Sequence, residues 1–236
     1  MTRLAIEGLN VWYGNVHALR GVSLTVGDGE CIGVLGPNGA GKSTLFRAIS
    51  RIVPSTGSIS LDGVELPSTP EKVARRGIAH VLEGRHIFPG MTVEDNLLLA
   101  QFSARRSDFA RDLERMLELF PILRQKFRTA AGELSGGQQQ ILALGRGLLM
   151  SPRILLLDEP SLGLAPIVVE QLASVIPSIR REWKTSILIS EQLIELVFAV
   201  AGYIYVIRRG EVAYRGEADR SSVTDQVLGS YFGDAG

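Results

Sequence analysis

The chain has 236 residues, and its 25 Lys and Arg are balanced by 25 Asp and Glu, so the formal net charge is zero. This balance argues against a nucleic-acid-binding protein, since such proteins usually carry a basic patch or stripe. No stretch reaches the ~20 apolar residues of a membrane helix, and the N-terminus lacks a signal-peptide pattern. With Cys31 as the only cysteine, we expect a soluble, single-domain protein of a reducing compartment.

In chain order, residues 4–8 and 22–26 have the composition of two strands, and a mostly apolar strand follows over 30–35. A helix is predicted from Lys42 onward. Residues 57–61 alternate in polarity like an edge strand and end at an Asp-Gly turn. The first third of the chain therefore predicts strands that surround one helix.

Between residues 85 and 150 the pattern changes to helices. One apolar face at helical spacing ends at a proline, and its members are Phe109, Leu113, Met116, Leu117 and Phe120. Strands are expected again over 187–189 and 203–207, and a short helix is expected from Ser221. The chain thus predicts an α/β fold with a helical insert.

A glycine-rich segment over residues 36–43 matches the phosphate-binding pattern G-x-x-x-x-G-K-[ST]. Its glycines let backbone N–H groups approach phosphates, and the following helix adds partial positive charge. Lys42 supplies a charge for the β- and γ-phosphates, and the Ser43 hydroxyl suits Mg²⁺. The predicted nucleotide contacts of this loop are Gly36, Pro37, Asn38, Gly39, Ala40, Gly41, Lys42, Ser43 and Thr44.

A second glycine motif, Leu-Ser-Gly-Gly-Gln, spans residues 134–138. Ser135 and Gln138 form a capping box, which would begin a helix in any protein. A well-capped core helix is therefore one interpretation. However, Gly136 and Gly137 weaken a helix by up to ~1 kcal/mol each, and exposed N–H groups that bind an anion would justify that cost.

An apolar strand over 153–157 ends in Asp158 and Glu159. A continuous apolar run is typical of a strand buried on both faces of a parallel sheet, and such sheets bind ligands at their carboxyl ends. We expect Asp158 to hold Mg²⁺ and Glu159 to polarise the water that attacks the γ-phosphate. A solvated turn is the alternative, which Pro160 allows, but the upstream phosphate loop favours the catalytic interpretation.

The three motifs, in this order, resemble those of ATP-binding cassette (ABC) ATPases, and the likeness covers about residues 4–216. The resemblance implies a P-loop NTPase (RecA-like) α/β core with a mostly parallel sheet. It also implies an N-terminal antiparallel β subdomain and an inserted α-helical subdomain. We expect one domain over 1–236, with the core over 1–84 and 151–236 and the insert over about 85–150.

The resemblance also assigns roles to residues outside the three motifs. Tyr13 occupies the position of an aromatic ring that stacks on adenine, although Trp12 and Tyr13 also fit an ordinary strand-end pair. Glu83 replaces the usual Gln, residues 161–166 lack the usual Asp, and Gln192 replaces a His. These departures resemble the branch that serves branched-chain amino acid importers, specifically the second of its two ATPases. Importers of urea, amides and aromatic acids look similar, so the solute stays open.

These replacements change the chemistry that we expect. Gln192 can donate a hydrogen bond to the γ-phosphate but can never become cationic. Glu83 adds a negative charge, so we expect it near Mg²⁺. The predicted catalytic residues are therefore Lys42, Glu159 and Gln192, and the predicted metal ligands are Ser43, Glu83 and Asp158.

The resemblance further implies partners for the chain. ATP would lie between the phosphate loop of one copy and Ser135, Gly136, Gly137 and Gln138 of a second ATPase, identical or related. An integral membrane permease would dock beside Glu83. Core packing under the loop explains most of the apolar residues that follow Glu83, and Phe88 and Met91 are the candidate contacts. The complex would include a separate solute-binding protein and no nucleic acid, and the chain would lie in the cytoplasm on the inner face of the membrane.

Two other classes of protein were compared with this interpretation. A soluble cassette protein of DNA repair or translation would usually show a long coiled-coil insert, a second cassette or a basic stripe. A P-loop kinase or GTPase would share residues 36–43 but has no reason for the motif at 134–138. Both classes therefore explain less of the chain than an importer ATPase does.

Overall fold

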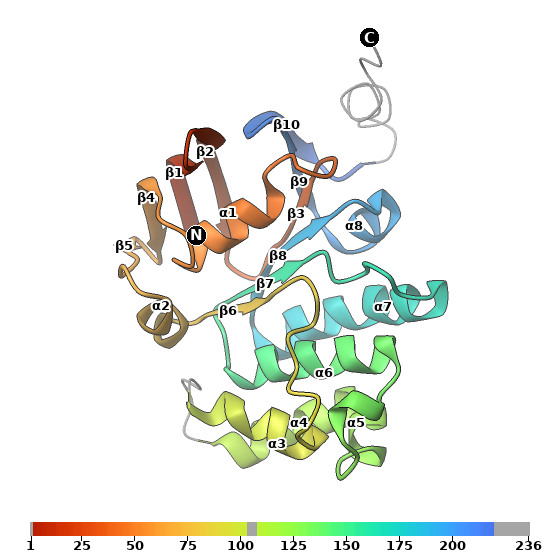
Figure 1. The fold of residues 1–236 in the computed structure, drawn as a ribbon. Helices are drawn as coiled ribbons and strands as arrows, with labels where there is room; N and C mark the ends of the chain where they lie inside the picture. The colour runs from red at the N-terminus through yellow and green to blue at the C-terminus, as the bar shows by residue number, and fades with distance from the viewer. Residues whose placement is uncertain (1, 103–107, 220–236) are drawn as a thin grey trace.

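The computed structural model describes residues 2–102 and 108–219, and it contains two sheets (Figure 1). The N-terminal sheet is antiparallel, with the strand order β2-β1-β4-β5. Its strands are β1 (Thr2–Tyr13), β2 (Val16–Gly27), β4 (Thr56–Leu61) and β5 (Val64–Glu65). The predicted antiparallel β subdomain is therefore present.

The second sheet has six strands in the order β10-β9-β3-β8-β7-β6, and only β10 runs antiparallel to its neighbour. Its strands are β3 (Cys31–Leu35), β6 (Ile78–Val81), β7 (Ile154–Asp158), β8 (Ser186–Glu191), β9 (Tyr203–Arg208) and β10 (Glu211–Glu217). Every residue of β3, β7 and β8 is buried, as expected for central strands covered on both faces. The predicted mostly parallel sheet is confirmed.

The helices divide between the two faces of this sheet. They are α1 (Lys42–Ile49), α2 (Pro70–Arg76), α3 (Val93–Leu98), α4 (Phe109–Leu119), α5 (Pro121–Gln125), α6 (Gly136–Leu149), α7 (Pro166–Trp183) and α8 (Ile194–Val200), with 3₁₀ turns at Leu99–Phe102 and Ala131–Glu133. Figure 1 shows α3, α4 and α5 grouped below α6, between β6 and β7 in the chain. This arrangement matches the expected α-helical insert.

Two hydrophobic clusters hold these layers together. One joins the insert to the sheet and includes Met116, Leu142 and Leu155. The other joins the N-terminal sheet, α1 and the opposite sheet face, and it includes Ile6, Phe46 and Leu156. The carboxyl ends of the parallel strands thus meet between two packed layers, which fixes the positions of the loops that follow them.

Some element predictions were wrong in detail. Residues 57–61 do not form an edge strand, because β4 pairs with β1 on one side and with the two-residue β5 on the other. The first two strands form one hairpin of two 12-residue strands, longer than predicted. The helix predicted from Ser221 lies outside the described residues. No helix in the described ranges has the length and apolar character needed to cross a membrane.

Candidate functional site

A cavity of about 460 Å³ lies where the loop after β3, the β1–β2 hairpin end and the β9–β10 turn meet. It brings together many of the predicted site residues. Its lining consists of Tyr13, Val16, His17, Ala18, Arg20, Asn38, Gly39, Gly41, Lys42, Ser43, Thr44, Glu83, Glu159, Arg209 and Gly210. Residues 159 and 83 reach it from the loops after β7 and β6, so five separate segments form this cavity.

Backbone conformation and packing both require glycine in the loop between β3 and α1. Gly39 and Gly41 have left-handed backbones, with φ of 76° and 113°. A Cβ at Gly36 would lie 2.4 Å from the carbonyl oxygen of Ile207. Helix α1 begins at Lys42, and its N-cap residue, Gly41, makes no side-chain hydrogen bond to the N–H groups of the first turn. These groups are therefore available to a phosphate.

Lys42 connects this loop to the end of β7. Its ammonium donates to the carbonyl oxygens of Gly36, at 2.7 Å, and Pro37, at 3.2 Å. It also forms an ion pair with Glu159, with Nζ 3.0 Å from Oε1. Both side chains are buried, at 3% and 8% exposure. Two of the predicted catalytic residues are thus in direct contact.

Asp158 has one carboxylate oxygen satisfied and one free. Its Oδ1 accepts from the hydroxyls of Ser43, at 3.1 Å, and Ser190, at 2.6 Å. Its Oδ2 is buried and has no hydrogen-bond partner among the residues that the structure describes. Burial raises the pKa of Asp158, the bonds from Ser190 and Ser43 oppose that rise, and the charges of Glu159 and Glu83 add to it. A cation at Oδ2 would relieve this cost.

Glu159 and Gln192 form the third contact of the site. Gln192 Nε2 donates to Glu159 Oε2 at 2.7 Å, so Lys42 and Gln192 hold opposite oxygens of one carboxylate. Glu159 has a left-handed backbone, with φ of 46°, which costs a non-glycine residue ~1–2 kcal/mol. Its N–H donates to the carbonyl oxygen of Ser190 at 3.0 Å, which helps to hold this conformation.

The predicted capping box at the start of α6 is present. Ser135 Oγ accepts from the Gln138 N–H, and Gln138 Oε1 accepts from the Ser135 N–H at 3.0 Å. Gly136 and Gly137 lie inside the first turn. Packing explains why both are glycines, which the sequence alone did not reveal. A Cβ at either would lie 2.8 Å from a neighbouring side chain, that of Arg85 or Val168 respectively.

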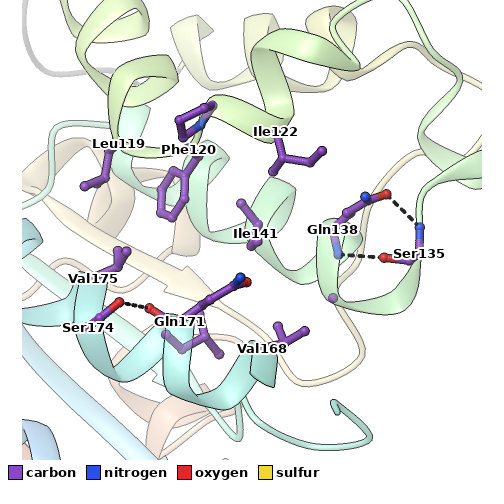
Figure 2. A pocket seen from close by; sticks show the side chains of 13 residues that line it. Leu119, Phe120, Ile122, Ser135, Gln138, Ile141, Val168, Gln171, Ser174 and Val175 are labelled. Carbon is purple, nitrogen blue, oxygen red and sulfur yellow. Dashed lines mark hydrogen bonds between the residues drawn. The ribbon is translucent and has the colours of Figure 1, made fainter. Parts of the chain in front are cut away.

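Ser135, Gly137 and Gln138 do not line the cavity that contains Lys42. They border a separate, mostly apolar cavity of about 460 Å³ between α4, α5, α6 and α7. Figure 2 shows the capping box at one end of this cavity, with Phe120 and Val175 further along it. Within one chain, the structure therefore does not bring the two glycine motifs to one site.

Both the sequence and the fold are similar to those of known proteins. Residues 19–162 match the family model described as ABC transporter. The chain belongs to the ABC transporter family.

Individual relatives of this ABC protein cover nearly all of it. It is 38% identical to the high-affinity branched-chain amino acid transport ATP-binding protein BraG of Pseudomonas aeruginosa, over 98% of this chain and 99% of that protein. It is 32% identical to the probable branched-chain amino acid transport ATP-binding protein LivF of Archaeoglobus fulgidus, over 89% and 90%. Among solved structures, the ADP conformation of MJ1267, an ATP-binding cassette of an ABC transporter, matches with a TM-score of 0.88 and 25% identity, over 99% and 100%.

Residues assigned by family resemblance have clear positions in this ABC protein. Tyr13 ends β1, lines the cavity and is 43% exposed. Trp12 stacks instead on His17, with ring centroids 4.3 Å apart, so the two aromatic residues are not equivalent. Glu83 lines the cavity, whereas Phe88 is half exposed and Met91 is partly buried.

Two residues that position the site were missed. Ser190 bonds both Asp158 and the Glu159 backbone. The buried Glu191 accepts from the N–H groups of Ser161, at 2.8 Å, and Gln192, at 3.2 Å. Burial raises its pKa, which these hydrogen bonds oppose. The signal was a polar pair at the end of the buried strand β8, the same signal that pointed to Asp158 and Glu159.

Proposed function

We propose that this chain is the ATP-binding and ATP-hydrolysing subunit of an ABC importer that drives uptake of branched-chain or other hydrophobic amino acids. The observation that carries the proposal is the contact of Lys42 and Gln192 with opposite oxygens of Glu159, beside the phosphate loop. The solute class rests on three relatives. BraG and BraF of Pseudomonas aeruginosa are high-affinity branched-chain amino acid transport ATP-binding proteins, and LivF of Archaeoglobus fulgidus is a probable one.

In this proposal, the site residues bind the triphosphate and prepare one water molecule. The loop amides and Lys42 hold the β- and γ-phosphates, and Tyr13 stacks on the base. Glu159 accepts a hydrogen bond from the attacking water and aligns it with the γ-phosphate. Gln192 orients the Glu159 carboxylate and donates toward the transferred phosphoryl group. Lys42 partly exchanges its Glu159 contact for the phosphates.

Mg²⁺ fits the residues beside the phosphate loop. The free, buried Oδ2 of Asp158 and the Ser43 hydroxyl are oxygen ligands of the type that Mg²⁺ prefers, and Glu83 adds charge nearby. Mg²⁺ is commonly held by one or two carboxylates together with phosphates and waters. When bound, the ion would neutralise charge on the phosphate oxygens.

A second ATPase subunit completes the site in this proposal. Ser135, Gly136 and Gly137 begin a 14-residue helix, and they lie outside the Lys42 cavity of their own chain. They would therefore contact ATP held by the partner. The partner is either a second copy or a related subunit, and similarity to both BraG and BraF of one organism supports the second possibility.

The remaining partners belong to the same proposal. A membrane permease would bind beside the Glu83 loop, where Phe88 is exposed, and a separate binding protein would deliver the solute. The chain would then lie in the cytoplasm, on the inner face of the membrane. Zero net charge gives no support for a nucleic-acid partner.

Uptake of labelled leucine by the native cell, with Lys42→Ala replacing this chain, tests the proposal. We expect a large and selective loss that the unmodified protein rescues, with a charged-surface variant such as Arg124→Ala as the matched control. Unchanged leucine uptake would contradict the solute class, and urea, amides and aromatic acids would be tested next. A purified chain that phosphorylates a small molecule, and forms no dimer as Glu159→Gln with ATP, would favour a kinase.

A further inference from the structure

The loop that follows β6 has an unusual backbone. Gly84, Arg85 and His86 all have left-handed conformations, with φ of 87°, 70° and 47°. Such conformations are uncommon for residues other than glycine, and two in succession persist only where the surroundings impose them. A short hydrogen bond from the His86 N–H to the Gly84 carbonyl oxygen, at 2.8 Å, closes the turn. The side-chain contacts of this loop should therefore show what imposes the conformation.

Arg85 fastens this loop to the first turn of α6. Its Nη1 donates to Gln139 Oε1 at 3.1 Å. Gln139 Nε2 donates to the Leu134 carbonyl oxygen at 3.1 Å, which fixes the amide with its oxygen toward Arg85. The guanidinium lies over Gly136, since a Cβ there would be 2.8 Å from Nη2 and 3.2 Å from Cζ. Glycine at this position thus makes room for Arg85.

A second arginine, Arg146 of α6, binds the other end of the same turn. Arg146 Nη2 donates to the His86 carbonyl oxygen at 2.6 Å, and its guanidinium carbon lies 5.7 Å from the centre of the Phe88 ring. The loop is therefore attached to the helical insert at two points. Glu83, two residues before Arg85, lines the Lys42 cavity. One short segment consequently spans from that cavity to the first turn of α6.

We propose that Arg85 is a positioning residue that fixes the first turn of α6, with Ser135 and Gly137, relative to the Glu83 end of the nucleotide cavity. The proposal rests on the proposed function, because the first turn of α6 acts there on ATP held by the partner. Arg85 is not among the residues that line the Lys42 cavity, although it lines the adjoining cavity together with Glu83 and Glu159. Its loss should therefore impair turnover while nucleotide affinity is preserved.

The test uses the full chain with Arg85→Ala, Arg85→Lys, Gln139→Ala and the Arg85→Ala/Gln139→Ala double variant. Arg124→Ala is the matched control, because Arg124 is an insert arginine paired with Glu114 on the surface. Affinity for a fluorescent ATP analogue and thermal stability are measured beside kcat and KM. Amide hydrogen exchange over residues 135–140 gives a readout that needs no turnover.

We expect Arg85→Ala and Gln139→Ala each to lower kcat about tenfold, with ATP affinity and KM within about twofold of the unmodified chain. The double variant should fall no further than Arg85→Ala, because both changes remove one contact. Arg85→Lys should retain part of the rate, since it keeps a donor. Exchange over 135–140 should rise in both alanine variants and not in Arg124→Ala.

Three results would overturn the proposal: unchanged kcat in Arg85→Ala, additive losses in the double variant, or loss of ATP affinity and thermal stability together with kcat. The failure of the proposed function looks different, because the unmodified chain would then show no ATP turnover that Lys42→Ala removes. In that case, unchanged hydrogen exchange in Arg85→Ala would still refute the positioning role, and raised exchange would support it.

Discussion

His80 should make the stability of the fold depend on pH in the weakly acidic range. It lies on β6 against α1, where its Nδ1 is 2.8 Å from the Ser50 hydroxyl oxygen. Within the described parts of the chain, its buried Nε2 has no hydrogen-bond partner. Burial, followed by the charges of Arg47 and His86, lowers the pKa of His80 to about 3. The folded protein therefore keeps this ring neutral at a pH where the unfolded chain protonates it.

The sign and size of the effect follow from proton linkage. The unfolded imidazole titrates near pH 6.5, so the His80 contribution is fully present above that pH. As pH falls below about 6.5, the unfolded state binds the proton first, and the free energy of unfolding drops by about 1.4 kcal/mol per pH unit. The loss reaches about 2.7 kcal/mol at pH 4.5 as an upper bound, and it continues toward pH 3.

Urea unfolding of the unmodified chain and of His80→Gln, from pH 7.5 to pH 4.5, measures this term. Glutamine keeps a polar group for Ser50 but does not titrate. The raised pKa values of Asp158 and Glu191 affect both proteins equally, so the difference between the two curves isolates His80. The stability of His80→Gln relative to the unmodified chain should rise as pH falls. Parallel curves over the whole range would refute the reasoning.

The site geometry gives three further predictions. Gln192→Ala should lower kcat about tenfold or more, because Glu159 loses its 2.7 Å hydrogen bond. Gln192→His should roughly preserve kcat. Steady-state ATPase assays compare the two variants, and unchanged turnover in the alanine variant would exclude Gln192 from the active site. Glu159→Gln should abolish hydrolysis while ATP binding persists, and size-exclusion chromatography with ATP should then show a stable dimer rather than a monomer. Phe88→Asp should leave the thermal stability and ATP turnover of the purified protein without permease unchanged, since the ring is 50% exposed, but it should reduce solute uptake in cells. Intact uptake would exclude Phe88 as a permease contact.

The sequence predicted those parts of the fold and site that depend on local patterns. The capping box at Ser135 follows from spacing alone, and the polar residues at the end of β7 follow from a buried strand that ends in carboxylates. Strand lengths and strand pairing were harder to predict from the sequence. The two-residue β5 is too short to show a period of two, and its pairing with β4 depends on the Asp62-Gly63 turn. Pairing is a tertiary property that local composition does not encode.

Contacts between side chains that are distant in the chain could not be predicted from the sequence for the same reason. Gly136 and Gly137 were explained by exposed N–H groups, yet the structure adds the packing of Arg85 and Val168 against them. Arg85 precedes Gln139 by 54 residues, so no spacing rule connects them. Glu191 was missed in the sequence, because its role in accepting hydrogen bonds from the N–H groups of Ser161 and Gln192 needed coordinates.

The arrangement of charges argues that a single chain is an incomplete ATPase. Lys42 pairs with Glu159 inside the cavity, so under the proposed function a bound triphosphate would draw part of the lysine charge toward the phosphates. Glu159 would then keep Gln192 as its neutral partner, and its carboxylate would become a better acceptor for water. The transferred phosphoryl group still needs donors on its remaining side, and the first turn of α6 faces a different cavity of the same chain. Closure of a second ATPase subunit onto the nucleotide would supply those donors, which ties hydrolysis to association.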